Sequence, residues 1–156
     1  MNQGIETADI ALLAPVPLKH LESGRAKVQQ EGRVAYGSRA WELFQRLDTL
    51  RNRLPVDVFI YASHDDAARY RPGVRWKARY IQSRKSNNGS HPEGARYRPD
   101  STHDDTNDSA VFWEIEDLEE LPEEAWIQLA RLTPYGKRKP YGHPFVPQGP
   151  ILIERP

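Results

Sequence analysis

The sequence lacks cysteine, contains one methionine and carries no net charge, with 22 Lys and Arg against 22 Asp and Glu. A strongly basic, histone-like protein is therefore excluded, and so are disulfides and thiolate metal sites. No apolar run approaches the roughly 18 residues that a transmembrane helix needs, and the first residues lack a basic signal region. We expect a cytoplasmic protein without membrane contact.

The composition fits one folded domain with much irregular structure. Only 38% of the 156 residues are hydrophobic, and the mean hydropathy is -0.77. The 13 prolines and 10 glycines predict many turns but not a low-complexity chain. We expect a flexible leader over residues 1–8 and a single domain over residues 9–156, which is long enough to bury its own core.

Hydrophobic patterns predict five strands and one clear helix. The helix is expected over residues 38–51, where Trp41, Phe44, Leu47 and Leu50 recur every three residues and Ser38 can cap the first turn. A second, short helix is expected over 122–132, where proline stands in the first turn. The strands are expected over 10–16, 56–63, 74–81, 110–117 and 151–154.

The order of these elements indicates the fold class. Consecutive strands without long crossovers favour an α+β fold with a mixed or antiparallel sheet, or a small bent barrel. Residues 18–35 are expected to form a short helix with loops or an ordered coil. Residues 82–109 are rich in Asn, Gly, Ser, Pro and Asp and predict a long loop, which in a compact domain is usually functional or disordered.

Charge is segregated along the chain. Residues 69–98 hold a single acid, Glu93, and nine basic side chains: Arg69, Arg71, Arg75, Lys77, Arg79, Arg84, Lys85, Arg96 and Arg98. Residues 100–124 hold eleven acids and no Lys or Arg, and four basic residues return over 131–139. The basic block could face a phosphate backbone, with Tyr70, Tyr80 and Tyr97 stacking on bases. Alternatively, the two blocks neutralise each other across neighbouring strands.

Sequence signals for catalysis are weak. Two His-Asp-Asp triplets begin at His64 and His103, but adjacent residues on an extended chain point to opposite sides and converge poorly on one ion. Ser63 next to His64 does not by itself make a nucleophilic triad. The sequence contains no P-loop, GxGxxG, GxSxG or HExxH motif. We therefore predict no catalytic residue, no metal site and no cofactor.

Several short motifs resemble a known family. Tyr36-Gly37-Ser38-Arg39-Ala40-Trp41 opens the predicted helix, and the strand 57–63 (Asp-Val-Phe-Ile-Tyr-Ala-Ser) follows it. The later strand 110–116 (Ala-Val-Phe-Trp-Glu-Ile-Glu) carries an aromatic pair. This order, over about residues 35–132, resembles the EVE branch of the PUA-like superfamily, whose relatives include the YTH and ASCH domains. In departure from the family pattern, Pro55-Val56-Asp57 stands where a Gly-Asp pair is usual.

The resemblance implies a bent β-barrel with helices packed outside and a pocket for a modified or flipped base of DNA or RNA. The residues that would line this pocket are Tyr36, Gly37, Ser38, Arg39, Tyr61, Ala62, Ser63, Trp76 and Trp113. A basic rim would hold the flanking phosphates, made of Arg75, Lys77, Arg79, Arg96 and Arg98.

Three functions follow from these patterns. The first is a non-catalytic domain that recognises a modified or flipped base in nucleic acid. The second is an accessory module that docks a protein partner through its acidic face over residues 100–124. The third is a metal-dependent hydrolase or nuclease that acts through His64 and nearby acids.

Overall fold

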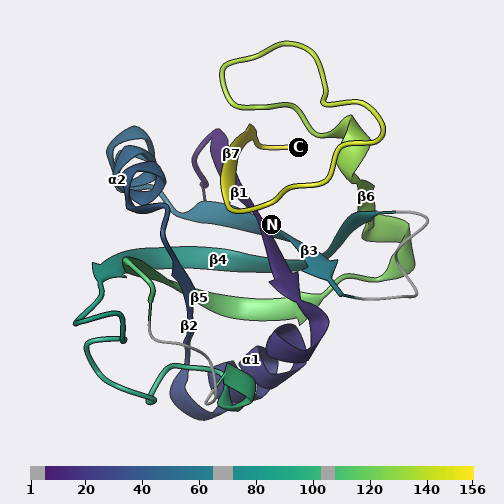
Figure 1. The fold of residues 1–156 in the computed structure, drawn as a ribbon. Coiled ribbons are helices and arrows are strands. Elements are labelled where there is room, and N and C mark those ends of the chain that lie inside the picture. The colour runs from purple at the N-terminus through teal and green to yellow at the C-terminus, as the bar shows by residue number, and fades with distance from the viewer. Residues whose placement is uncertain (1–5, 65–71, 103–107) are drawn as a thin grey trace.

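The structure is a computed structural model that describes residues 6–64, 72–102 and 108–156. Seven strands, two helices and short 3₁₀ turns make up its elements (Figure 1). In chain order, the strands and helices are β1 (Ile10–Pro17), α1 (Leu18–Glu31), β2 (Val34–Ser38), α2 (Trp41–Leu50), β3 (Val56–Ser63), β4 (Gly73–Lys85), β5 (Val111–Glu120), β6 (Ile127–Gln128) and β7 (Ile151–Glu154).

All seven strands join in one mixed sheet with the order β2-β5-β4-β3-β1-β7, and β6 pairs with the start of β4. Strand β1 runs parallel to β3 and antiparallel to β7, whereas the β3–β4, β4–β5 and β2–β5 pairs are antiparallel. The sheet curls into an open half-barrel with the two helices set apart along it (Figure 1). The expected α+β class with a mixed, bent sheet is thus present, as a half-barrel.

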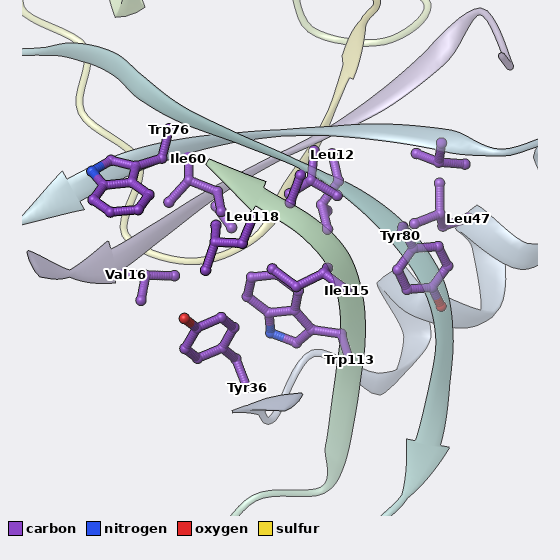
Figure 2. Close-up of a cluster of buried hydrophobic side chains, with 14 of the residues drawn as sticks. Leu12, Val16, Tyr36, Leu47, Ile60, Trp76, Tyr80, Trp113, Ile115 and Leu118 are labelled. Carbon is purple, nitrogen blue, oxygen red and sulfur yellow. The ribbon is translucent and has the colours of Figure 1, made fainter. Parts of the chain in front are cut away.

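The inner face of the half-barrel holds the main core. Alternate residues of the strands point inward, as the period of two requires, and Leu21 of α1 and Phe44 and Leu47 of α2 pack against them. An aromatic row runs through this core, in which Tyr36 contacts Trp113, Trp113 contacts Phe44, and Phe44 contacts Tyr80. Figure 2 shows Tyr36 and Tyr80 at opposite ends of the row.

The outer face is covered unevenly. Over β1, β3 and β7, a second apolar cluster forms with Leu129 and Leu132 of the C-terminal segment. Over β2 and β5, Tyr97 of the loop 86–102 packs on Ala35 and Phe112. Between these clusters the outer face of β4 and β5 is charged.

Four segments of the chain differ from the sequence predictions. Residues 18–35 form a full helix, α1, and then β2, which was not predicted. Helix α2 begins at Trp41 after an N-cap at Ala40, because Ser38 is still part of β2. Strand β4 extends to Lys85, so the loop that follows is shorter than expected. The helix over 122–132 is wrong: two 3₁₀ turns flank β6, which pairs with Gly73 and Val74.

The two ends of the chain can be described only in part. Residues 1–5 of the predicted leader lie outside the described residues, while Ala8 is buried and donates its backbone N–H to Pro55 O over 2.8 Å. In the part of the chain that the structure describes, neither helix is long and apolar enough to cross a membrane.

Candidate functional site

Helix α1 and strand β2 meet closely at Tyr36. A Cβ added at Gly24 would lie 2.1 Å from the Tyr36 hydroxyl oxygen, so only glycine permits this approach. The hydroxyl of Tyr36 donates to His20 O over 2.8 Å. Burial raises the pKa of Tyr36 well above its ordinary value, against a smaller opposing effect of the Arg98 charge, and the phenol stays neutral. Tyr36 is therefore fixed in one orientation.

A second close approach joins β2 to the segment before β5. A Cβ at Gly37 would lie 2.2 Å from Ser109 Oγ and 3.2 Å from Phe112 Cε1. The backbone N–H of Ala110 also donates to Ser38 O over 2.9 Å. Ser109 Oγ itself has no hydrogen-bond partner among the described residues. A hydroxyl that can donate or accept is thus held against the end of β2.

These contacts surround a hollow of about 290 Å³ at the ends of β1 and β2, which we call the Tyr36 hollow. Tyr36 and Trp113, whose ring centroids are 5.1 Å apart, lie at its inner wall, but both belong to the main core and are only 5% and 2% exposed. Its complete lining is Pro15, Val16, Pro17, His20, Tyr36, Gly37, Arg98, Thr102, Asp108, Ser109, Trp113 and Pro150. The volume lies at the low end of ligand pockets, which suits a single planar ring system rather than an extended ligand.

The rim of the Tyr36 hollow carries groups of both charges. Arg98 Nη1 donates to Ala35 O over 2.7 Å, and its guanidinium lies over the Phe112 ring. Asp108 pairs with Arg39 at 2.5 Å; both side chains are exposed, so this ion pair contributes little to stability. The hollow therefore combines a partly apolar lining with hydrogen-bond donors and acceptors.

A larger hollow of about 590 Å³ adjoins the first and shares Arg98, Thr102 and Ser109 with it. The loop 86–102 forms most of its wall, including His91. Arg98 lies where the two hollows meet, so it can contact a ligand in either of them.

The loop 86–102 is attached to the sheet through a buried carboxylate. Glu114 of β5 accepts hydrogen bonds from His91 Nε2 (3.0 Å), Arg33 Nη1 (2.9 Å) and Gln82 Nε2 (3.2 Å), and its side chain is 0% exposed. His91 Nδ1 accepts the Glu93 N–H, so the imidazole is the neutral Nε2–H tautomer. Burial alone would raise the pKa of Glu114, but the three hydrogen bonds outweigh it and hold the pKa below its ordinary value.

Of the nine residues predicted to line a base pocket, Tyr36, Gly37 and Trp113 lie in the wall of the Tyr36 hollow. Ser38 and Arg39 follow directly: Ser38 Oγ accepts the Ala40 N–H, and Arg39 pairs with Asp108 of the rim.

The other four predicted pocket residues lie elsewhere. Trp76 and Ala62 are buried in the main core, and Figure 2 shows Trp76 beside Ile60, its cross-strand neighbour. Tyr61 packs against the outer cluster, because alternate residues of β3 point to opposite faces. Ser63, at the end of β3, has its hydroxyl 3.3 Å from His64 Nδ1. The predicted single hollow containing Tyr61, Ser63 and Trp76 is therefore wrong in its geometry.

The predicted basic rim is also divided. Arg98 lines the hollow, and Arg96 pairs with Glu31 and Glu93 at the surface. Arg75, Lys77 and Arg79 alternate with the core residues of β4 and so lie on the outer face, away from the Tyr36 hollow. They cannot form the rim of this hollow.

Only part of the acidic block is paired with basic groups of the same chain. Among the described residues Glu116, Glu119, Glu123 and Glu124 have no ion-pair partner, and most of the basic partners lie outside residues 69–98, so the second interpretation of the charge pattern is met only in part. Arg79 pairs with Asp117 at 3.5 Å, and Lys77 lies opposite Glu119 in the β4–β5 register. Further ion pairs join Arg25 to Glu120, Lys27 to Asp100, Arg39 to Asp108 and Arg33 to Glu114.

Neither His-Asp-Asp triplet can be examined as a complete metal or acid/base site. Asp65, Asp66 and the whole triplet at 103–105 lie outside the described residues, as do Arg69, Tyr70 and Arg71. Within residues 6–64, 72–102 and 108–156, no group of three or more His, Asp or Glu side chains could hold a metal ion.

Sequence reasoning missed His20, Thr102, Asp108 and Ser109 as wall residues of the hollow. All four lie in segments without a clear hydrophobic pattern. The one sequence signal near these residues is the pair Pro15 and Pro17, which marks the end of β1 just before α1 begins. This pair does not by itself indicate a pocket.

In comparisons with known proteins, the chain matches no family model, no curated protein and no solved structure. The resemblance to EVE domains therefore stays a prediction that depends on the short motifs alone.

Proposed function

We propose that the protein binds nucleic acid without catalysis and receives one base, modified or flipped out of its stack, in the Tyr36 hollow. The observation that carries this proposal is one small, partly apolar hollow, with Tyr36 and Trp113 at its inner wall, that also contains the Ser109 hydroxyl, which has no hydrogen-bond partner among the described residues. A planar base requires an apolar or aromatic wall for its faces and donors and acceptors for its edge.

The surroundings of the hollow support the same function. Arg98 adjoins both hollows, so its guanidinium is placed to meet a phosphate or a base edge at the entrance. The larger hollow beside it gives room for the strand on one side of the extruded base.

The test is a binding titration with labelled oligonucleotides about fifteen nucleotides long, as single strands of DNA and RNA and as duplexes with a central mismatch. The central base is either unmodified or methylated. We expect at least one modified or unpaired base to bind more tightly than its paired, unmodified counterpart. Affinity should fall as salt rises, because phosphate contacts release counterions.

Two tyrosine variants give a matched comparison. Tyr36→Leu alters the wall of the hollow, whereas Tyr80→Leu makes the same change at the other end of the aromatic row (Figure 2). Both variants remove a large buried side chain and should destabilise the fold by a similar amount, measured by urea unfolding. Only Tyr36→Leu should abolish the preference for the central base.

Ser109→Ala supplies a variant without a steric penalty. Loss of one neutral hydrogen bond, worth about 0.5–1.5 kcal/mol, should weaken binding about 2- to 10-fold. Binding that ignores the central base, or that responds equally to both tyrosine variants, would refute the proposed pocket.

A further inference from the structure

Trp41, the first residue of α2, differs from the other tryptophans of the chain. Its side chain is 49% exposed, and its ring has no aromatic or cationic partner among the described residues. Each of the other three has such a partner: Trp76 with Arg25, Trp113 with Tyr36 and Trp126 with Arg75. The indole of Trp41 is therefore a large aromatic surface that the fold leaves unused.

Trp41 also forms a wall of a separate hollow of about 480 Å³, which we call the Trp41 hollow. It lies where α2 begins and β4 ends, and its lining is Trp41, Gln45, Ser83, Lys85, Ala110 and Val111. Most of this lining is apolar. Lys85 is exposed and has no ion-pair partner in residues 6–64, 72–102 or 108–156.

The Trp41 hollow and the Tyr36 hollow are joined by two short segments. Gly37 and Ser109 line the Tyr36 hollow, whereas Trp41 and Ala110 line the Trp41 hollow. Trp41 follows Gly37 by four positions, and these four steps span at most roughly 14 Å even when the chain is fully extended. This distance is short enough for nucleotides of one strand to occupy both hollows.

We propose that the Trp41 hollow stacks a second base. This base belongs to the same nucleic-acid strand as the extruded base in the Tyr36 hollow, so the inference rests on the proposed function. The indole face supplies a stacking surface that accepts any of the four bases, since each has a π face. The Lys85 ammonium supplies a charge for a phosphate, and the Gln45 amide can both donate to and accept from a base edge.

The proposal specifies the kind of nucleic acid. A base inside a duplex already stacks on both neighbours, so its faces are not available to Trp41. The protein should therefore prefer single strands or unpaired regions over intact duplex, and should prefer them without strong sequence dependence at the stacked position.

The experiment compares Trp41→Ala with two control variants by fluorescence anisotropy of a labelled oligonucleotide that the unchanged protein binds. Leu50→Ala is an equally simple truncation of an exposed side chain on the same helix, and Trp126→Ala removes an exposed tryptophan elsewhere. Trp41→Ala should weaken binding about 5- to 150-fold. Each control should change the affinity less than 2-fold, by the small scale of surface substitutions.

A second arm locates the stacked base. Oligonucleotides in which one nucleotide at a time, on either side of the central base, lacks its base are titrated against the unchanged protein and Trp41→Ala. One abasic position should reproduce the loss caused by Trp41→Ala, and the two changes together should cost no more than either alone. If no position shows this coupling, or if Leu50→Ala weakens binding as much, the stacking role is overturned.

The outcomes separate this inference from the proposed function. If Tyr36→Leu abolishes base preference while Trp41→Ala has no effect, the reader function stands and the second site fails. If the unchanged protein binds none of the oligonucleotides, both fail, and Trp41 is left as a surface for a protein partner.

Discussion

Replacement of Glu114 by alanine should loosen the loop 86–102 and destabilise the whole domain. The carboxylate is fully buried, and its removal leaves the His91 Nε2–H, itself buried, without an acceptor. Loss of one partner from a buried charged network costs about 3–5 kcal/mol. Arg33 is one-third exposed and can be rehydrated, so we expect about 3 kcal/mol, which corresponds to a fall in melting temperature of roughly 6–12 °C for a chain of this size.

The assay is urea unfolding together with amide hydrogen exchange. The midpoint should fall with an unchanged m-value, and exchange should rise most in residues 86–99. Glu114→Gln keeps the shape of the side chain but places an amide NH₂ donor against the donors of His91, Arg33 and Gln82. It should therefore still lower the free energy of unfolding by about 1–3 kcal/mol. Glu116→Ala, two residues along β5, has no hydrogen-bond or ion-pair partner among the described residues and should cost less than about 0.5 kcal/mol.

Two results would refute this reasoning. A loss below about 1 kcal/mol for Glu114→Ala would mean that the network is not a net anchor. A uniform rise in exchange over the whole chain would mean that the loop is not the element that Glu114 holds.

Three further predictions concern the same elements. In the folded protein the pKa of Glu114 lies below its ordinary value of 4.5. The stability that ionised Glu114 contributes should therefore be complete above pH 4.5 and be lost as the pH falls below that value, as urea unfolding at a series of pH values would show. Gly24→Ala, which in a helix normally stabilises by about 1 kcal/mol, should destabilise here. In a Tyr36→Phe background the same change should cost clearly less, because the hydroxyl that lies 2.1 Å from the new Cβ is gone while the ring carbon at 3.2 Å remains; thermal melts of both backgrounds check this. Gly37→Ala should cost about 1–3 kcal/mol, and Ser109→Gly in the same chain should restore part of it; equal stability of the single and double variants would show that Ser109 is not the obstacle.

Long apolar strands could be predicted from the sequence because their signal is local. The run Val56–Ser63 is rich in β-branched and aromatic residues, and Trp41, Phe44 and Leu47 show helical spacing, so β3 and α2 were found. Strand β2 was missed because it has only five residues, begins two positions after Gly32 and ends at a residue that looked like a helix cap. Helix α1 was not recognised at its full length because its buried face includes Gly24 and Lys27, two residues that ordinarily indicate a breaker and a surface.

The candidate site could be predicted only where it depends on one strand pair. Tyr36 and Trp113 are register partners in β2 and β5, and the resemblance placed both in the pocket. Trp76 was misplaced because the resemblance assigned it to the pocket, whereas its alternation with Ala78 and Tyr80 along β4 turns it into the main core.

The position of β7 affects the order in which the chain can complete its sheet. Strand β1 precedes the other described strands, yet one of its two edges is closed by the much later segment Ile151–Glu154. During synthesis on a ribosome, the backbone N–H and C=O groups along that edge stay unpaired until β7 has emerged. An open edge of this kind invites pairing with other nascent chains. The interval before β7 arrives is therefore the period in which this protein is most exposed to aggregation and to chaperone binding.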